Sequence, residues 1–129
     1  MLRRIQEQKL VHAADSQVAG TPASALKSSL ETLRDLDVVG DVRGSGLLWG
    51  VEFVADRRNK TPFPPEKNFA GKVGAACLRR GLLVYPMQGC VDGIAGDHLL
   101  IAPPAVITAE EIRQSVADLR AAIASVARG

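Results

Sequence analysis

The stretch GDVRGSGLLWGVEFV, residues 40–54, places four glycines within eleven positions and then alternates apolar residues with others. This alternation is typical of a strand, because successive side chains of a strand point to opposite faces. One face of that strand would be strongly apolar, with Leu47, Trp49, Val51 and Phe53. The glycines allow a different interpretation, since glycine-rich loops also bind phosphate groups ahead of a helix.

The spacing of the glycines excludes the known phosphate-binding motifs. The dinucleotide fingerprint is G-x-G-x-x-G at the start of a helix, whereas Gly50 comes one position late here and a strand pattern follows. A P-loop needs Gly-Lys-Ser/Thr, which does not follow. We therefore expect a tight turn between two strands with close approach of their backbones. Arg43 is the one candidate for a functional cation in this stretch, and an ordinary structural ion pair is its simpler role.

The sequence before this stretch predicts helices. The first 20 residues carry a weak apolar stripe, and a second helix then has Thr21 as its N-cap and Pro22 at its first position. Three leucines of this second helix share one face: Leu26, Leu30 and Leu33. We expect residues 1–37 to form a helical segment and residues 38–129 to form a domain built on a sheet.

The sequence after this stretch predicts a loop, a helix and two strands. Charged residues and three prolines mark residues 55–65 as a loop. The helix that follows should begin near Pro65 and end at Gly81. Two short apolar strands, residues 81–86 and 97–104, then flank a glycine-rich loop.

The last helix has the strongest local signal in the chain. Thr108 and Glu111 form a capping box, followed by a continuous apolar stripe of Ile112, Val116, Leu119 and Ile123. Capping and the helix dipole also explain the adjacent carboxylates of Glu110 and Glu111, which need no catalytic role. The order of elements favours an α+β fold in two layers, with a small, mainly antiparallel sheet of about four strands and helices packed on one face.

Composition excludes several classes of function. The 129 residues are 47% hydrophobic and carry a net charge of +2, as expected for one globular domain. Basic residues are scattered and aromatic residues are few, so we expect no nucleic-acid partner. No apolar run is long enough to span a membrane and no signal peptide is recognisable, so we expect no membrane association and a cytoplasmic location. Cys77 and Cys90 lack metal-ligand spacing, which predicts buried small hydrophobic residues and no metal site.

Two further side chains are candidates for facing a substrate. His98 begins a predicted strand beside Asp97 and could act as a donor, although a histidine at the surface rim or a hydrogen-bonded core histidine is the simpler expectation. Tyr85 ends a predicted strand at a glycine-rich loop and could line a cleft, although a packed core aromatic is the simpler expectation. No serine or cysteine lies in a nucleophile elbow.

Taken in order, several segments resemble a known family. They are VVGDVRGSGLLWGVEFV, PFPPE, a helix ending in RRGLLVYP, and GDHLLIAPPAVITAEEI followed by an amphipathic helix. This set is similar to the C-terminal small domain of class III aminotransferases, which are pyridoxal-phosphate enzymes of fold type I. The resemblance covers about residues 30–125, and the upstream helix would correspond to the connection between the large and small domains.

The resemblance implies a partner that carries the cofactor. In that family the large domain binds pyridoxal phosphate through a Schiff-base lysine, and the cofactor serves amino transfer between an amine and a keto compound. The lysines of this chain do not match that residue: Lys9, Lys27, Lys60, Lys67 and Lys72. We therefore expect no catalytic and no cofactor-binding residue here, no stable binding of pyridoxal phosphate, and inactivity of the isolated chain.

The resemblance also bears on the substrate. Members of the family that act on amino acids often carry an arginine three residues before the first proline of the Pro-Pro pair, where it binds the substrate carboxylate. That position is Leu100 here, which favours an amine or an ω-amino acid as donor. The alternative function is a non-catalytic interaction module, which either complements a large domain or second subunit or self-associates as a homo-oligomer.

Overall fold

Four strands form one antiparallel sheet in the computed structural model, which describes residues 21–89, 91–104 and 106–129. The strands lie in the order β1-β2-β4-β3 and comprise β1 (Val39–Ser45), β2 (Leu48–Phe53), β3 (Tyr85–Met87) and β4 (Asp97–Ile101). The predicted α+β fold with its antiparallel sheet is confirmed. The helix predicted ahead of Thr21 lies outside the described residues.

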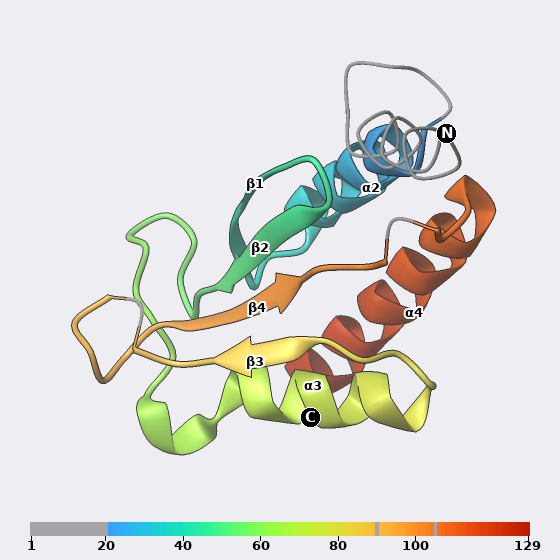
Figure 1. The fold of residues 1–129 in the computed structure, drawn as a ribbon. Helices are drawn as coiled ribbons and strands as arrows, with labels where there is room; N and C mark the ends of the chain where they lie inside the picture. The colour runs from blue at the N-terminus through green and yellow to red at the C-terminus, as the bar shows by residue number, and fades with distance from the viewer. Residues whose placement is uncertain (1–20, 90, 105) are drawn as a thin grey trace, which may run out of the picture.

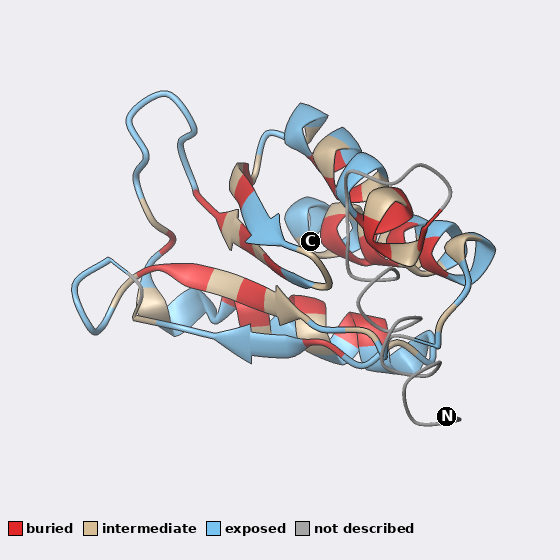
Figure 2. Cartoon of the chain, turned by 45° about the horizontal axis from the view of Figure 1, so that its top comes forward, coloured by how far each residue is buried: buried red, intermediate tan, exposed pale blue. Residues whose placement is uncertain are grey.

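Three α-helices of the described part pack together on one face of the sheet (Figure 1). They are α2 (Pro22–Glu31), α3 (Phe69–Arg79) and α4 (Ala109–Arg128), with short 3-10 helices at η1 (Thr32–Asp35) and η2 (Pro65–Lys67). Burial alternates along β2, where Trp49, Val51 and Phe53 are buried (Figure 2). The sheet therefore has one core face under the helices and one open face.

The glycine-rich stretch forms the β1–β2 hairpin, as predicted. Gly46 has a φ of 59°, in the left-handed region that favours glycine at a tight turn. The indole Nε1 of Trp49 donates a hydrogen bond to the carbonyl of Gly46 at 3.0 Å. At Gly44 a Cβ would lie 2.4 Å from the carbonyl oxygen of Leu48, so only glycine fits opposite this turn. The glycines serve the hairpin and do not form a phosphate loop.

Both predicted N-caps are confirmed. The hydroxyl of Thr21 accepts from the backbone N–H of Ser24 at 3.2 Å. At the start of α4, Thr108 Oγ1 accepts from the N–H of Glu111 and Glu111 Oε1 accepts from the N–H of Thr108, each at 3.1 Å. Capping boxes are local in sequence, which explains why the residues alone located this helix.

The start of α3 differs from the prediction. The helix begins at Phe69 and not at Pro65, because Asn68 has a φ of 49° and separates α3 from the 3-10 turn before it. The carboxylate of Asp97 on β4 accepts from the N–H of Ala70 at 2.7 Å. A residue 27 positions away thus caps α3, and no local pattern could indicate it.

The third and fourth strands are shorter than predicted. Residues 81 and 82 complete the end of α3, since the N–H of Leu82 donates to the carbonyl of Cys77 at 2.9 Å and Gly81 has a φ of 81°. Strand β3 therefore begins only at Tyr85. Strand β4 ends at Ile101, ahead of two prolines that have no N–H for a sheet ladder.

Cys77 lies in the core, as predicted, whereas Cys90 lies outside the described residues. Burial raises the pKa of the Cys77 thiol to about 11. At pH 8 we expect about a hundredfold less thiolate than for an ordinary thiol, and correspondingly slow modification of the native protein. Alkylation kinetics of a Cys90→Ser variant, with and without urea, would measure this. Equal rates in the native and unfolded protein would contradict the burial.

Candidate functional site

All three candidate residues lie on or beside the open face of the sheet. The strand register defines a first row of residues across the four strands, Arg43, Gly50, Leu100 and Tyr85. The next row consists of Asp41, Glu52, His98 and Met87. Gly50 and Leu100, which are 50 positions apart in sequence, are thus neighbours. We refer to these two rows, together with Leu48, as the open sheet face.

A shallow hollow of about 410 Å³ lies over Gly50 in the middle of this face. Gly50 has no side chain, and a Cβ there would meet no atom nearer than 3.8 Å. Arg43, His98 and Leu100 are among the residues that line the hollow. The structure therefore brings Arg43 and His98 to one depression, while Tyr85 lies at its border as the partner of Leu100.

The charge of Arg43 is balanced by two carboxylates. Its Nη1 lies 2.8 Å from Asp41 Oδ2 and 3.0 Å from Glu52 Oε2. The hydrogen bond from Arg43 holds the pKa of the Asp41 carboxyl below its usual value, and the same bond raises the pKa of Arg43. The structural ion pair expected for Arg43 is confirmed. An incoming carboxylate would have to compete with two anions for this guanidinium.

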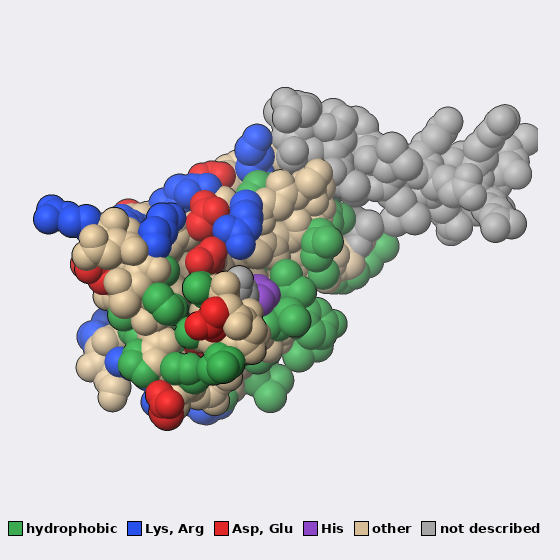
Figure 3. Space-filling model, turned by 90° about the vertical axis from the view of Figure 1, so that its left-hand side faces the viewer, with side chains coloured by type: hydrophobic (Ala, Val, Ile, Leu, Met, Phe, Trp, Pro, Cys, Tyr) green, Lys and Arg blue, Asp and Glu red, His purple; other side chains and the backbone are tan. Residues whose placement is uncertain are grey.

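His98 and Tyr85 differ in burial. His98 is half-buried opposite Glu52, and its Nδ1 is buried without a hydrogen-bond partner among the described residues. Tyr85 is 52% exposed, so the expectation of a packed core aromatic was wrong. The reason is that β3 is an edge strand of three residues, all of which are exposed. Figure 3 shows the histidine between hydrophobic side chains and a group of mixed charges.

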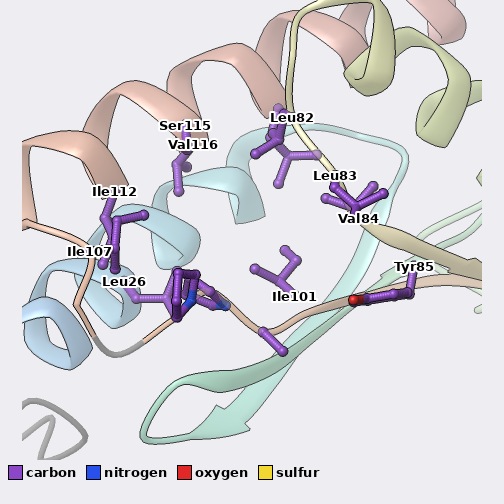
Figure 4. Close-up of a pocket in the computed structure, with 14 residues that line it drawn as sticks. Leu26, Leu82, Leu83, Val84, Tyr85, Ile101, Ile107, Ile112, Ser115 and Val116 are labelled. Atoms are coloured by element: carbon purple, nitrogen blue, oxygen red, sulfur yellow. The ribbon is translucent and has the colours of Figure 1, made fainter. Parts of the chain in front are cut away.

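A second depression is an apolar groove of about 330 Å³ between α2, α4 and the segments that flank β3 and β4. Ile112 and Val116 of α4 and Leu26 of α2 line one side, and Ile101 and Tyr85 line the other (Figure 4). Fourteen residues line the groove, and none of them is charged. The groove can hold apolar groups and offers no side chain for acid–base chemistry other than hydroxyls.

The described residues do not fit pyridoxal phosphate. That cofactor requires a lysine amine at its aldehyde and donors at its phosphate. Lys60 Nζ donates to the carbonyl of Gly40 at 2.9 Å, and Lys67 lies over the ring of Phe63. Lys27 and Lys72 are exposed on helices, and no lysine lines the hollow or the groove. A cofactor pocket would need residues from elsewhere.

Residues 21–89, 91–104 and 106–129 contain neither a metal-binding cluster nor a membrane-spanning helix. No group of three or more His, Cys, Asp or Glu residues in these segments is arranged to hold a metal ion. No helix in them combines the length and the apolar character that a membrane span requires.

Comparisons with known proteins identify the fold. No family model matches the chain. An uncharacterised aminotransferase of Schizosaccharomyces pombe is 44% identical over 95 residues, which cover 74% of this chain and 21% of that protein. An adenosylmethionine-8-amino-7-oxononanoate aminotransferase of Nitratidesulfovibrio vulgaris is 38% identical over 101 residues, covering 78% and 17%. The solved structure of a transaminase from the marine bacterium Virgibacillus superposes with a TM-score of 0.84 at 27% identity, over 98% of this chain and 27% of that one.

These similarities define a transaminase fold. The chain belongs to the class III aminotransferases and corresponds to one part of them, which the sequence resemblance assigns to the C-terminal small domain. It spans about a fifth of the length of the curated relatives.

Sequence reasoning placed Glu52 on the mixed face of its strand but gave it no role. Its position opposite His98 and beside Arg43 follows from the register of β2 with β1 and β4. Charge alternation could have suggested a cross-strand pair, because oppositely charged residues on neighbouring strands favour such contacts. Only the register selects which residues meet.

Proposed function

We propose that this chain acts as the small domain of a pyridoxal-phosphate-dependent aminotransferase, which transfers an amino group between an amine or ω-amino acid and a keto acid. The open sheet face is the observation that carries this proposal. It is free of helices, and it carries Arg43, His98 and Tyr85 in two adjacent rows. In this role the face would form one wall of a cavity whose other walls, with the cofactor, belong to a large domain.

The chemistry of this wall favours an amine or ω-amino donor. Leu100 stands in the row between Gly50 and Tyr85, where an arginine would be needed to bind an α-carboxylate. The only arginine of the two rows, Arg43, is held by Asp41 and Glu52. In the cavity, the residues of the two rows would position a donor through apolar contact and exclude water from its carbon chain.

By itself the 129-residue chain is then inactive. The measurement is turnover of an amine with a keto acid by the purified chain in the presence of pyridoxal phosphate, with borohydride reduction to trap any cofactor bound to lysine. We expect neither product nor a covalently fixed cofactor. Product formation without a second polypeptide, or stoichiometric labelling of one lysine, would overturn the proposal. A full-length relative assayed in parallel shows that the conditions support turnover.

A second candidate role is a non-catalytic interaction module, which would complement a separate large domain or self-associate. The exposed apolar side chains of the open sheet face favour it, since Leu48, Tyr85 and Met87 are 58%, 52% and 44% exposed. Large uncovered apolar surfaces usually mark an interface. Size-exclusion chromatography of the purified chain tests this role, because a monomer without an exposed apolar patch would contradict both complementation and self-association.

A further inference from the structure

The sheet ends in two edge strands, β3 and β1, which differ in length and in the groups that cover them. Strand β3 forms one edge with only three residues, one of them a proline. Strand β1 forms the other edge with seven residues, Val39–Ser45. An uncovered edge of this length presents free N–H and C=O groups that can pair with another chain.

Side chains occupy the polar groups of the β1 edge. Lys60 Nζ donates to the carbonyl of Gly40 at 2.9 Å, and Arg34 Nη2 donates to the carbonyl of Val42. The N–H of Val42 donates to Asp41 Oδ1 at 2.9 Å, and the same oxygen accepts from Arg34 Nη1 at 3.1 Å. The carbonyl and N–H of Val42 bond to side chains and not to β2, and Gly40, at the irregularity between Val39 and Asp41, also has its carbonyl bonded to a side chain, so these groups point to the side of β1 away from β2. That side is the outer edge.

The two cations come from segments that another arginine holds in place. Arg57 donates from Nε to the carbonyl of Val39 at 3.2 Å and from Nη2 to that of Leu36 at 2.8 Å and to that of Arg34. It thereby links the loop after β2 to the turn between η1 and β1. Lys60 lies in the same loop, which the bridge between Asp56 and Thr61 closes. The covering groups are thus part of an ordered structure.

The covered edge is complementary to itself. If two copies of β1 pair antiparallel about Val42, residue 41 of each lies opposite residue 43 of the other. Each Asp41, which pairs with Arg43 of its own chain at 2.8 Å, then also faces Arg43 of the second copy. Oppositely charged residues directly across two strands stabilise the pair, and a two-fold arrangement provides this contact twice.

We propose that the outer edge of β1 is a pairing surface for a second copy of this chain, kept closed by Lys60, Arg34 and Asp41. Removing the two cations frees the carbonyls of Gly40 and Val42 and releases Asp41 from Arg34. The two sheets can then join through β1 into one sheet of eight strands. In the native chain the covered edge prevents this growth, which leaves the open sheet face as the surface available to partners.

The test is a double variant, Arg34→Ala with Lys60→Gly, which leaves Arg57 intact. Glycine is chosen because Lys60 has a φ of 58°, where glycine is unstrained. Sedimentation equilibrium should show at least a tenfold smaller dimer dissociation constant than for the native chain. The matched control is Arg113→Ala with Lys72→Ala, which removes the same charge; Arg113 pairs with a glutamate three residues before it, as Arg34 does. The control should behave like the native chain.

A spin label at Ser45→Cys, in a Cys90→Ser background, identifies the geometry of the dimer. Residue 45 of one copy lies opposite residue 39 of the other, so the two labelled positions should be about 20 Å apart along the strands. If the double variant does not fold, Lys60→Gly alone can be measured in its place. This substitution removes one exposed contact and should give a smaller gain in association. Unchanged association in a folded variant, or dimers whose label separation differs clearly from this distance, would overturn the proposal.

Discussion

Replacing Gly44 by alanine is expected to destabilise the domain by about 2 to 3 kcal/mol, as overpacking against atoms that cannot move aside does. The added Cβ would lie 2.4 Å from the carbonyl oxygen of Leu48, 2.6 Å from Trp49 Cδ2 and 2.7 Å from Trp49 Cα. Two of these three atoms belong to the backbone of β2. The hairpin can accept the methyl group only by separating its two strands at the turn.

The matched control for Gly44→Ala is Gly50→Ala. Both glycines lie in strands of the same hairpin, but a Cβ at Gly50 would meet its nearest atoms at 3.8 Å. Urea denaturation followed by far-UV circular dichroism compares the two variants, and the fluorescence of Trp49, the only tryptophan, reports on the turn itself. The steric argument fails if both variants lose the same stability, or if Gly50→Ala loses more.

Gly44 and Gly50 show how much of the hairpin could be predicted from the sequence alone. The G-x-G spacing and the alternation after it were enough to predict a hairpin, because both signals are local. They did not distinguish Gly44, which lies opposite Trp49, from Gly50, which lies between Arg43 and Leu100. The difference depends on the faces that the register gives to each position.

The arrangement of the candidate site also depends on which strands pair and could not be predicted from local patterns. His98 and Tyr85 were singled out by residue type and by their place near strand ends, and Arg43 as the cation of the glycine-rich stretch. Their arrangement in two adjacent rows arises from pairing across four strands, with β4 between β2 and β3. Strands that are not consecutive in sequence become neighbours in this order, and no periodicity encodes such a pairing.

Contacts made by single long side chains also could not be predicted from the sequence. The stretch of residues 55–65 was predicted as a loop on its charge and prolines, which is correct for most of its length. Arg57 nevertheless reaches three backbone carbonyls, those of Arg34, Leu36 and Val39. Arginine carries five donors on a rigid fork, so a single residue can fix a turn that composition marks only as exposed.

Phe69 is the side chain whose truncation should cost the most. It is fully buried at the first position of α3, with its ring 5.0 Å from that of Phe53 in an edge-on contact and 4.3 Å from that of Phe63 in a stacked one. Phe69→Ala is expected to destabilise the domain by about 3 to 5 kcal/mol, through lost burial and the cavity that remains. A domain of this kind is stable by only about 5 to 15 kcal/mol, so much of its stability would be lost.

The control for Phe69→Ala lies on the same helix. Leu78 is 64% exposed, and Leu78→Ala should change the free energy of unfolding by no more than about 0.5 kcal/mol. Chemical denaturation of both variants at equal protein concentration measures the difference. Because Phe69 also joins β2 to the loop that carries Phe63, its loss should loosen the start of α3 and the cap that Asp97 provides. Faster amide exchange at Ala70 than at residues near the end of α3 would show this loosening. Equal stability of the Phe69→Ala and Leu78→Ala variants would contradict the expected contribution of the Phe69 ring to the core.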